Sequence, residues 1–183
     1  SDQAIEKAKL LSAESGVPAT FLCCDLYSLP AQLDQQFDIV FTSYGTISWL
    51  PDLDRWADVV AHFIKPGGRF VFAEFHPAVW MFSDDFSEVA YNYFKDDAIV
   101  ETTEGSYAVE DAGTKLTSVC WNHSLGEVMT SLLRKNLRID TFKEYNYSPY
   151  NCLAGMVEVG PNQFQIERFG NKFPLVYALL ATK

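Results

Sequence analysis

Two segments that directly follow apolar runs hold the residues best placed to do chemistry. Residues 42–45, with Tyr44 among them, follow the apolar core Ile39–Phe41, and His76 follows the run Arg69–Phe75. In an open parallel sheet, ligands bind outside the carboxyl ends of the strands, so both segments are expected at a site. A histidine titrates near neutral pH and can accept a proton. Tyr44 and His76 are therefore the candidate catalytic residues.

Both residues also have a structural interpretation. His76 could cap the turn before Pro77, and Tyr44 could pack under the segment 78–121 instead of lining a pocket. Four further aromatic residues are candidate substrate contacts: Trp49, Trp80, Tyr147 and Tyr150. They could form a wall that orients a planar substrate, or they could belong to the core, as aromatic residues near a sheet edge often do.

The composition excludes several classes of partner. The 183 residues carry 14 basic and 24 acidic side chains, a net charge of −10, with no run of Lys or Arg. Binding to nucleic acid or to an anionic membrane requires clustered positive charge, so we expect neither partner and favour a small-molecule substrate. The four cysteines form no C-x-x-C pair, and no apolar run approaches the roughly 18 residues that span a bilayer. We expect a cytoplasmic protein without a metal site.

Helical and strand patterns alternate along the chain, which is long enough for one domain, 1–183, with a sizeable core. Helices are expected over 1–15, 54–64 and 124–136. Strands are expected over 19–24, 37–41, 69–75, 137–147 and 174–182, with the strand around Ile39–Phe41 buried on both faces. The acidic and aromatic segment 78–121 is expected to be an insertion with strands near 99–103 and 114–121 around a turn at Asp111–Gly113, and 148–173 a long loop.

An ordered set of motifs carries a family resemblance. Asp25 follows a short strand, Phe37–Val40 leads into a polar turn, Trp49–Asp52 precedes a helix, and Ile64–Gly68 closes that helix before the next strand. Together with the closing hairpin, this set resembles class I S-adenosylmethionine-dependent methyltransferases of the small-molecule type. The resemblance implies an α/β fold: a Rossmann-like, mostly parallel sheet with an antiparallel carboxyl-terminal hairpin, an inserted β-rich cap at about 78–121, and an incomplete amino end.

The resemblance also implies roles for residues that match the family's motifs. Asp25 matches the acid that accepts a hydrogen bond from the adenine amino group, and Leu26 matches the residue whose backbone amide faces the ring. Ser43, Tyr44 and Gly45 match the segment that runs along the methionine end of S-adenosylmethionine and faces the substrate. These five residues are the candidate cofactor-binding residues.

One part of the family pattern is missing. Such enzymes carry, before the first helix seen here, a glycine-rich turn and a strand whose terminal acid holds the ribose, whereas the only glycine before residue 45 is Gly16. We therefore expect a truncated chain that binds S-adenosylmethionine weakly or not at all. The loss of a neighbouring strand would expose the edge of the strand at 37–41, which makes a homodimer possible through that edge.

The sequence is compatible with three hypotheses for the function. The first is methyl transfer to a small-molecule acceptor, with His76 as base if the acceptor carries a proton and with the aromatic wall shielding a sulfonium. The second is a truncated or degenerate, non-catalytic domain that self-associates. The third is a nicotinamide oxidoreductase, since Tyr91 and Lys95 have the spacing of a dehydrogenase pair; we interpret that spacing as coincidence because it lies in the acidic insertion.

Overall fold

The first unit of the chain is short and helical. The computed structural model describes residues 1–104 and 115–183, which divide into the units Ser1–Gln35 and Gln36–Lys183. The first unit holds the helix α1 (Asp2–Ser15) and the 3-10 helix η1 (Leu26–Ala31). The expected helix over 1–15 is thus present.

The strand expected over 19–24 is absent, and this prediction was wrong. These residues have no regular secondary structure, and Leu22 is 42% exposed. A strand is stabilised by hydrogen bonds to a neighbouring strand, and the first unit, all of whose residues are described, contains no other strand. The apolar composition of the segment was therefore not enough to make it extended and paired.

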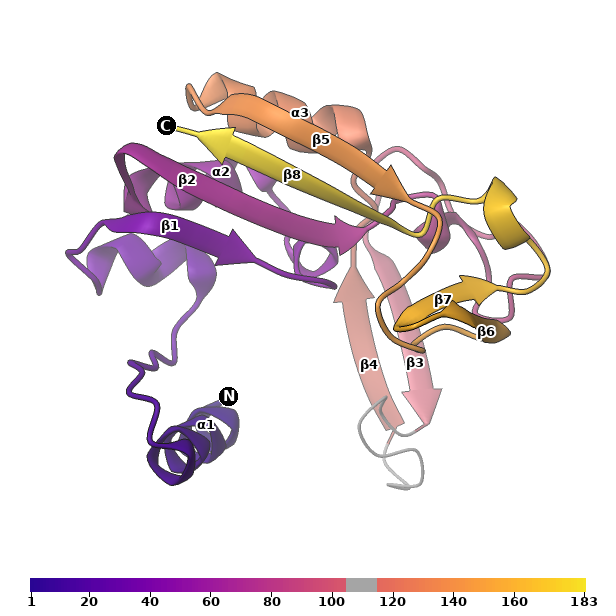
Figure 1. The fold of residues 1–183 in the computed structure, drawn as a ribbon, viewed down its shortest axis with the longest axis horizontal. Helices are drawn as coiled ribbons and strands as arrows, with labels where there is room; N and C mark the ends of the chain where they lie inside the picture. The colour runs from indigo at the N-terminus through magenta and orange to yellow at the C-terminus, as the bar shows by residue number, and fades with distance from the viewer. Residues whose placement is uncertain (105–114) are drawn as a thin grey trace. The chain divides into compact units, whose positions relative to one another are not determined.

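Four strands form the main sheet of the second unit. They lie in the order β1 (Phe37–Thr42), β2 (Ile64–Phe75), β8 (Val176–Thr182) and β5 (Arg138–Tyr145). The strands β1 and β2 are parallel, and β8 runs antiparallel to both β2 and β5, so that three strands share one direction (Figure 1). This arrangement confirms the expected mostly parallel sheet with an antiparallel carboxyl-terminal hairpin.

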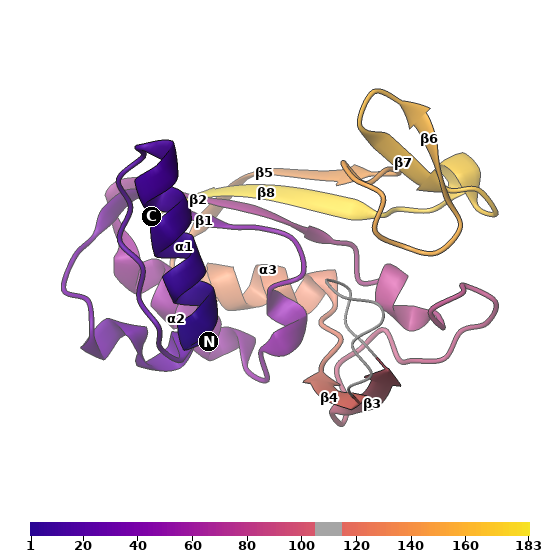
Figure 2. The ribbon, with the colours of Figure 1, turned by 90° about the horizontal axis from the view of Figure 1, so that it is seen from below.

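Two helices cover one face of this sheet. Figure 2 shows α2 (Leu53–Phe63) and α3 (Leu125–Arg134) on the same side of it. The Trp56 ring of α2 packs between two rings of β2, with centroid distances of 5.7 Å to Phe70 and 5.4 Å to Phe72. All three side chains are buried, so this aromatic contact is part of the core between α2 and the sheet.

The strand β1 is covered on one side only, which corrects the expectation that it is buried on both faces. Ile39 and Phe41 are 61% and 63% exposed, while Val40 and Thr42 are half-buried. β1 is also the edge strand of the described sheet. The apolar side chains of Ile39 and Phe41 therefore form a surface that no described element of the second unit covers.

The turn between α2 and the body of β2 requires glycine. A Cβ at Gly68 would lie 2.9 Å from Ile64 Cγ2 and 3.0 Å from the carbonyl oxygen of Asp38. Gly67 has a φ of 76° and donates its N–H to the carbonyl of Lys183 at 2.9 Å. These contacts join three elements of the sheet and give the glycine pair a structural role.

Within the insertion, the expected strands are present as the antiparallel pair β3 (Ile99–Glu104) and β4 (Lys115–Cys120). The turn expected at Asp111–Gly113 lies outside the described residues. The segment 148–173, expected as a loop, contains a second antiparallel pair, β6 (Met156–Gly160) and β7 (Gln163–Ile166). These strands of five and four residues are too short for their alternation to stand out in the sequence.

None of the helices in the described ranges is long and apolar enough to cross a membrane.

Candidate functional site

Three of the predicted site residues meet around one phenylalanine. The Phe75 ring lies 5.6 Å from Tyr44, 5.5 Å from Trp80 and 6.2 Å from Tyr150, and Tyr44 and Tyr150 are 5.9 Å apart, all between ring centroids. Tyr44 follows β1 and Phe75 ends β2, and the parallel pairing of these strands brings their carboxyl ends to one edge of the sheet. We call Tyr44, Phe75, Trp80 and Tyr150 the aromatic cluster.

The other two predicted aromatic residues are placed differently. The Tyr147 ring is half-buried and packs on Tyr145 at 5.5 Å. Burial raises the pKa of Tyr44, and the charges of Tyr145, Tyr147 and Glu74 raise it further. Trp49, in the 3-10 helix η2 (Ile47–Trp49), is 55% exposed, and within the described ranges no ring contact joins it to the cluster.

His76 is buried and both of its ring nitrogens are occupied. Its Nδ1 accepts the backbone N–H of Ala78 at 3.1 Å, and its Nε2 lies 3.0 Å from Glu144 Oε1. Since Nδ1 accepts, Nε2 carries the proton and donates it to the carboxylate; the tautomer is assigned from these partners. Burial lowers the pKa of His76, and Glu144 opposes that shift. The ring thus caps the turn that leads to Trp80.

Glu74 is a residue that sequence reasoning missed. Its carboxylate is buried, and Oε1 accepts the N–H groups of Gly45 at 2.5 Å and Phe75 at 2.8 Å, while Oε2 accepts those of Thr46 at 2.8 Å and Ile47 at 3.3 Å. Burial raises the pKa of Glu74, and the four backbone donors oppose that rise. A glutamate inside an apolar strand was a signal, because a buried charge needs partners.

The five candidate cofactor residues fall in both units. In the first unit, Asp25 is exposed and caps η1, with Oδ1 accepting the N–H of Tyr27 at 2.9 Å, and Leu26 begins that helix. In the second unit, Ser43, Tyr44 and Gly45 form the turn after β1, where Gly45 has a φ of 71°. That these two groups bind one cofactor stays a prediction.

A small cavity adjoins the aromatic cluster. Its volume is about 10 Å³, room for about one water molecule, and Glu74, Trp80, Trp121, His123 and Tyr177 are among its lining residues. The Tyr177 hydroxyl is buried and has no hydrogen-bond partner among the described residues. The cavity therefore contains a polar group that a bound water or ligand could satisfy.

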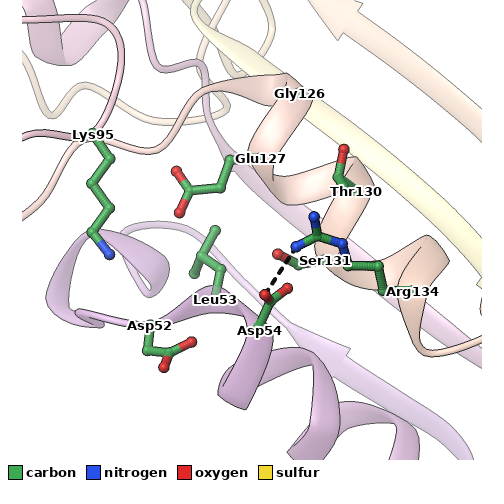
Figure 3. A pocket seen from close by; sticks show the side chains of 9 residues that line it. All are labelled: Asp52, Leu53, Asp54, Lys95, Gly126, Glu127, Thr130, Ser131 and Arg134. Carbon is green, nitrogen blue, oxygen red and sulfur yellow. Dashed lines mark hydrogen bonds and ion pairs between the residues drawn. The ribbon is translucent and has the colours of Figure 1, made fainter.

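A larger pocket lies away from the predicted residues. It has a volume of about 540 Å³ and lies between the amino-terminal end of α2 and the length of α3 (Figure 3). Its wall carries both signs of charge, and Asp54 and Arg134 form an ion pair at 3.0 Å across it. None of the predicted site residues lines it, and its polar, open wall is typical of a solvated surface hollow.

Comparison with known proteins agrees with this fold. Residues 1–68 match the model of a family described as a methyltransferase domain. No curated protein sequence matches the chain.

Among similar solved structures is an S-adenosylmethionine-dependent methyltransferase from Clostridium acetobutylicum, with a TM-score of 0.62 and 15% identity over 100% of this chain and 72% of that one. A SAM-dependent methyltransferase from Methanosarcina mazei gives a TM-score of 0.60 and 15% identity over 100% and 78% of the two chains. An S-adenosylmethionine-dependent methyltransferase from Mesorhizobium loti gives a TM-score of 0.54 and 17% identity, over 95% of this chain and 75% of that one.

The fold is therefore that of the class I S-adenosylmethionine-dependent methyltransferases. The order and directions of the sheet strands, the sequence match over residues 1–68 and the similar solved structures agree on this point. The fold that the sequence resemblance implied is confirmed. A fold of this kind can carry different activities, so the acceptor and the site depend on this chain's own residues.

Proposed function

We propose that the protein transfers a methyl group from S-adenosylmethionine to a small-molecule acceptor. The observation that carries this proposal is the aromatic cluster of Tyr44, Phe75, Trp80 and Tyr150 at the carboxyl ends of β1 and β2. In an open α/β sheet this edge is where ligands bind. When bound, S-adenosylmethionine supplies an electrophilic methyl group on a positively charged sulfur.

Residues of each unit, taken separately, have the chemistry to bind a part of that cofactor. Asp25 is an exposed carboxylate in extended backbone, and it can accept a hydrogen bond from the adenine amino group, while Leu26 offers its backbone amide to the ring. The turn Ser43–Gly45 would hold the methionine end, with the half-buried Tyr44 against it. Aromatic faces attract cations, so the ring of Tyr44 suits a positively charged sulfur.

The aromatic cluster would act by placement and by exclusion of water. Methyl transfer proceeds in line, and its rate depends strongly on holding the two reacting atoms aligned. Packed rings keep few rotamers, so Trp80 and Tyr150 would restrict a planar acceptor to one orientation beside Tyr44.

His76 has a smaller part in this proposal than its position suggested. Its Nδ1 is engaged by Ala78 and its Nε2 proton by Glu144, so neither nitrogen offers a lone pair to an acceptor in this conformation. We propose that His76 holds the turn before Trp80, and that the preferred acceptor atom is one that reacts without losing a proton to this ring.

The proposal is tested by methyl transfer itself. The chain is incubated with S-adenosylmethionine carrying a labelled methyl group and with panels of small amines, phenols and carboxylic acids, and S-adenosylhomocysteine formation is measured. We expect turnover with at least one panel. Trp80→Ala should lower the rate of methyl transfer at least tenfold, which corresponds to about 1.4 kcal/mol of activation free energy. Phe94→Ala is the matched control, since Phe94 is 72% exposed and outside the aromatic cluster. Equal activity of both variants would contradict the assigned site.

A second candidate function is self-association without catalysis, which the exposed edge strand favours. We propose that β1 can pair with β1 of a second copy, because it lies at the edge of the described sheet and presents Ile39 and Phe41 at 61% and 63% exposure. Sedimentation velocity tests this, with Phe41→Lys expected to shift a dimer to monomer. A chain that sediments as a monomer at all concentrations would exclude it.

A further inference from the structure

Glu74 connects the end of β2 to the turn after β1 through its side chain. The carboxylate comes from the inner strand of the sheet, beside β1 (Figure 1). It accepts the N–H groups of three consecutive residues of the turn, Gly45, Thr46 and Ile47, at 2.5, 2.8 and 3.3 Å. Glu74 itself is only 2% exposed. Three successive backbone donors are therefore committed to one buried side chain.

The pattern of donors indicates the ionised form of this side chain. Two N–H groups point at each carboxylate oxygen, those of Gly45 and Phe75 at Oε1 and those of Thr46 and Ile47 at Oε2. A protonated carboxyl group would turn one oxygen into a donor that faces other donors. The arrangement is thus complementary to a negative charge, which the low exposure of the site leaves little screened by solvent.

We propose that Glu74 is the positioning residue of the candidate site: it fixes the turn that carries Tyr44 and places a buried negative charge directly behind that turn. Since Gly45, Thr46 and Ile47 have their N–H groups engaged, the turn is organised before any ligand arrives. Tyr44 precedes Gly45 directly, so its ring position depends on the same contacts.

The charge has a further consequence, which rests on the proposed function. S-adenosylmethionine carries a positive sulfur, and its product S-adenosylhomocysteine is neutral there. If Ser43–Gly45 hold the methionine end, a negative charge behind Gly45 favours the cationic cofactor over the neutral product. Glu74 would thereby assist both the binding of the methyl donor and the release of its product.

The first arm of the test needs no cofactor. Amide hydrogen exchange of Gly45, Thr46 and Ile47 is measured in the wild-type chain, in Glu74→Gln, and in Val60→Ala, a buried change on α2. Glutamine keeps the size but presents an NH2 group to two of the donors. We expect these amides to exchange roughly tenfold faster in Glu74→Gln and not in Val60→Ala. Unchanged exchange in Glu74→Gln would overturn the positioning role.

The second arm compares the affinities for S-adenosylmethionine and S-adenosylhomocysteine. Loosening of the turn alone would weaken both, whereas loss of the charge weakens the cation selectively. We expect Glu74→Gln to lower the ratio of the two affinities by roughly tenfold and Glu74→Asp, which keeps the charge, to restore part of it. An equal loss for both ligands would overturn the role of the charge. Binding of neither ligand by the wild type would overturn the proposed function and the charge role, while the exchange arm would still decide the positioning role.

Discussion

The carboxylate of Glu74, at the end of β2, accepts the backbone N–H of Thr46, in the turn after β1, at 2.8 Å. This contact joins the carboxyl ends of two parallel strands, and the aromatic cluster lies beside it, with Phe75 next in sequence to Glu74. The polar contact and the ring contacts together determine where Tyr44 lies. The proposed binding of a cofactor at this edge is therefore expected to depend on the same contacts as its stability.

Truncation of Glu74 is expected to destabilise the chain. In Glu74→Ala the N–H groups of Gly45, Thr46 and Ile47 lose a charged acceptor, which should lower the free energy of unfolding by about 3 kcal/mol. Urea denaturation measures this change. A loss below about 0.5 kcal/mol, the size of an ordinary surface substitution, would mean that the turn does not depend on the carboxylate.

Two tryptophans offer a matched pair for the core. Trp56 is 1% exposed and packs on Phe70 and Phe72, whereas Trp49 is 55% exposed. Trp56→Ala is expected to cost about 3–5 kcal/mol of stability, and Trp49→Ala about 0.5 kcal/mol or less. Thermal unfolding of both variants checks the difference. Similar losses in the two would show that the helix and sheet packing described for α2 is incorrect.

The buried hydroxyl of Tyr177 is expected to be dispensable for folding. It has no hydrogen-bond partner among the described residues, and burial raises the pKa of Tyr177 well above its ordinary range. Tyr177→Phe removes an unsatisfied polar group, so its stability should equal that of the wild type or exceed it by about 1 kcal/mol. If denaturation instead shows a clear loss, the hydroxyl is satisfied by a bound water in the adjoining cavity.

Acid should destabilise the chain in part through His76. Burial lowers the pKa of this buried ring below its ordinary value of 6.5, which the unfolded chain regains. As the pH falls, the unfolded state therefore takes up the proton first, and stability present above pH 6.5 is lost as the pH falls through the folded-state pKa. The slope of stability against pH should flatten in His76→Gln. An unchanged slope in His76→Gln would contradict a contribution of His76 to the acid destabilisation.

Sequence patterns predicted most of the fold and three residues of the aromatic cluster. The helical stripes gave α1, α2 and α3, and the placement of residues after strands led to Tyr44, Trp80 and Tyr150, which do meet in space. Parallel strands bring their ends together whatever their exact composition, so this inference needed only the order of the elements.

The remaining features depend on contacts that a linear pattern does not encode. The partners of Glu74 are backbone N–H groups, which every residue but proline carries, so nothing in residues 45–47 marks them as its donors. The same apolar character that predicted a doubly buried β1 belongs to a half-exposed edge strand, since burial depends on what lies across the sheet. The prediction of a strand over 19–24 was wrong for a related reason, since a strand needs a neighbouring strand to bond to.

The central claim is that Tyr44 and the aromatic cluster form a methyl-donor site, and a calorimetric titration with S-adenosylmethionine tests it most directly. Wild type, Tyr44→Ala and the exposed control Phe94→Ala are compared. The claim predicts weak but measurable heat of binding for the wild type and the control, and at least a tenfold weaker affinity for Tyr44→Ala, about 1.4 kcal/mol. Equal binding by all three chains, or no heat with any of them, would contradict it.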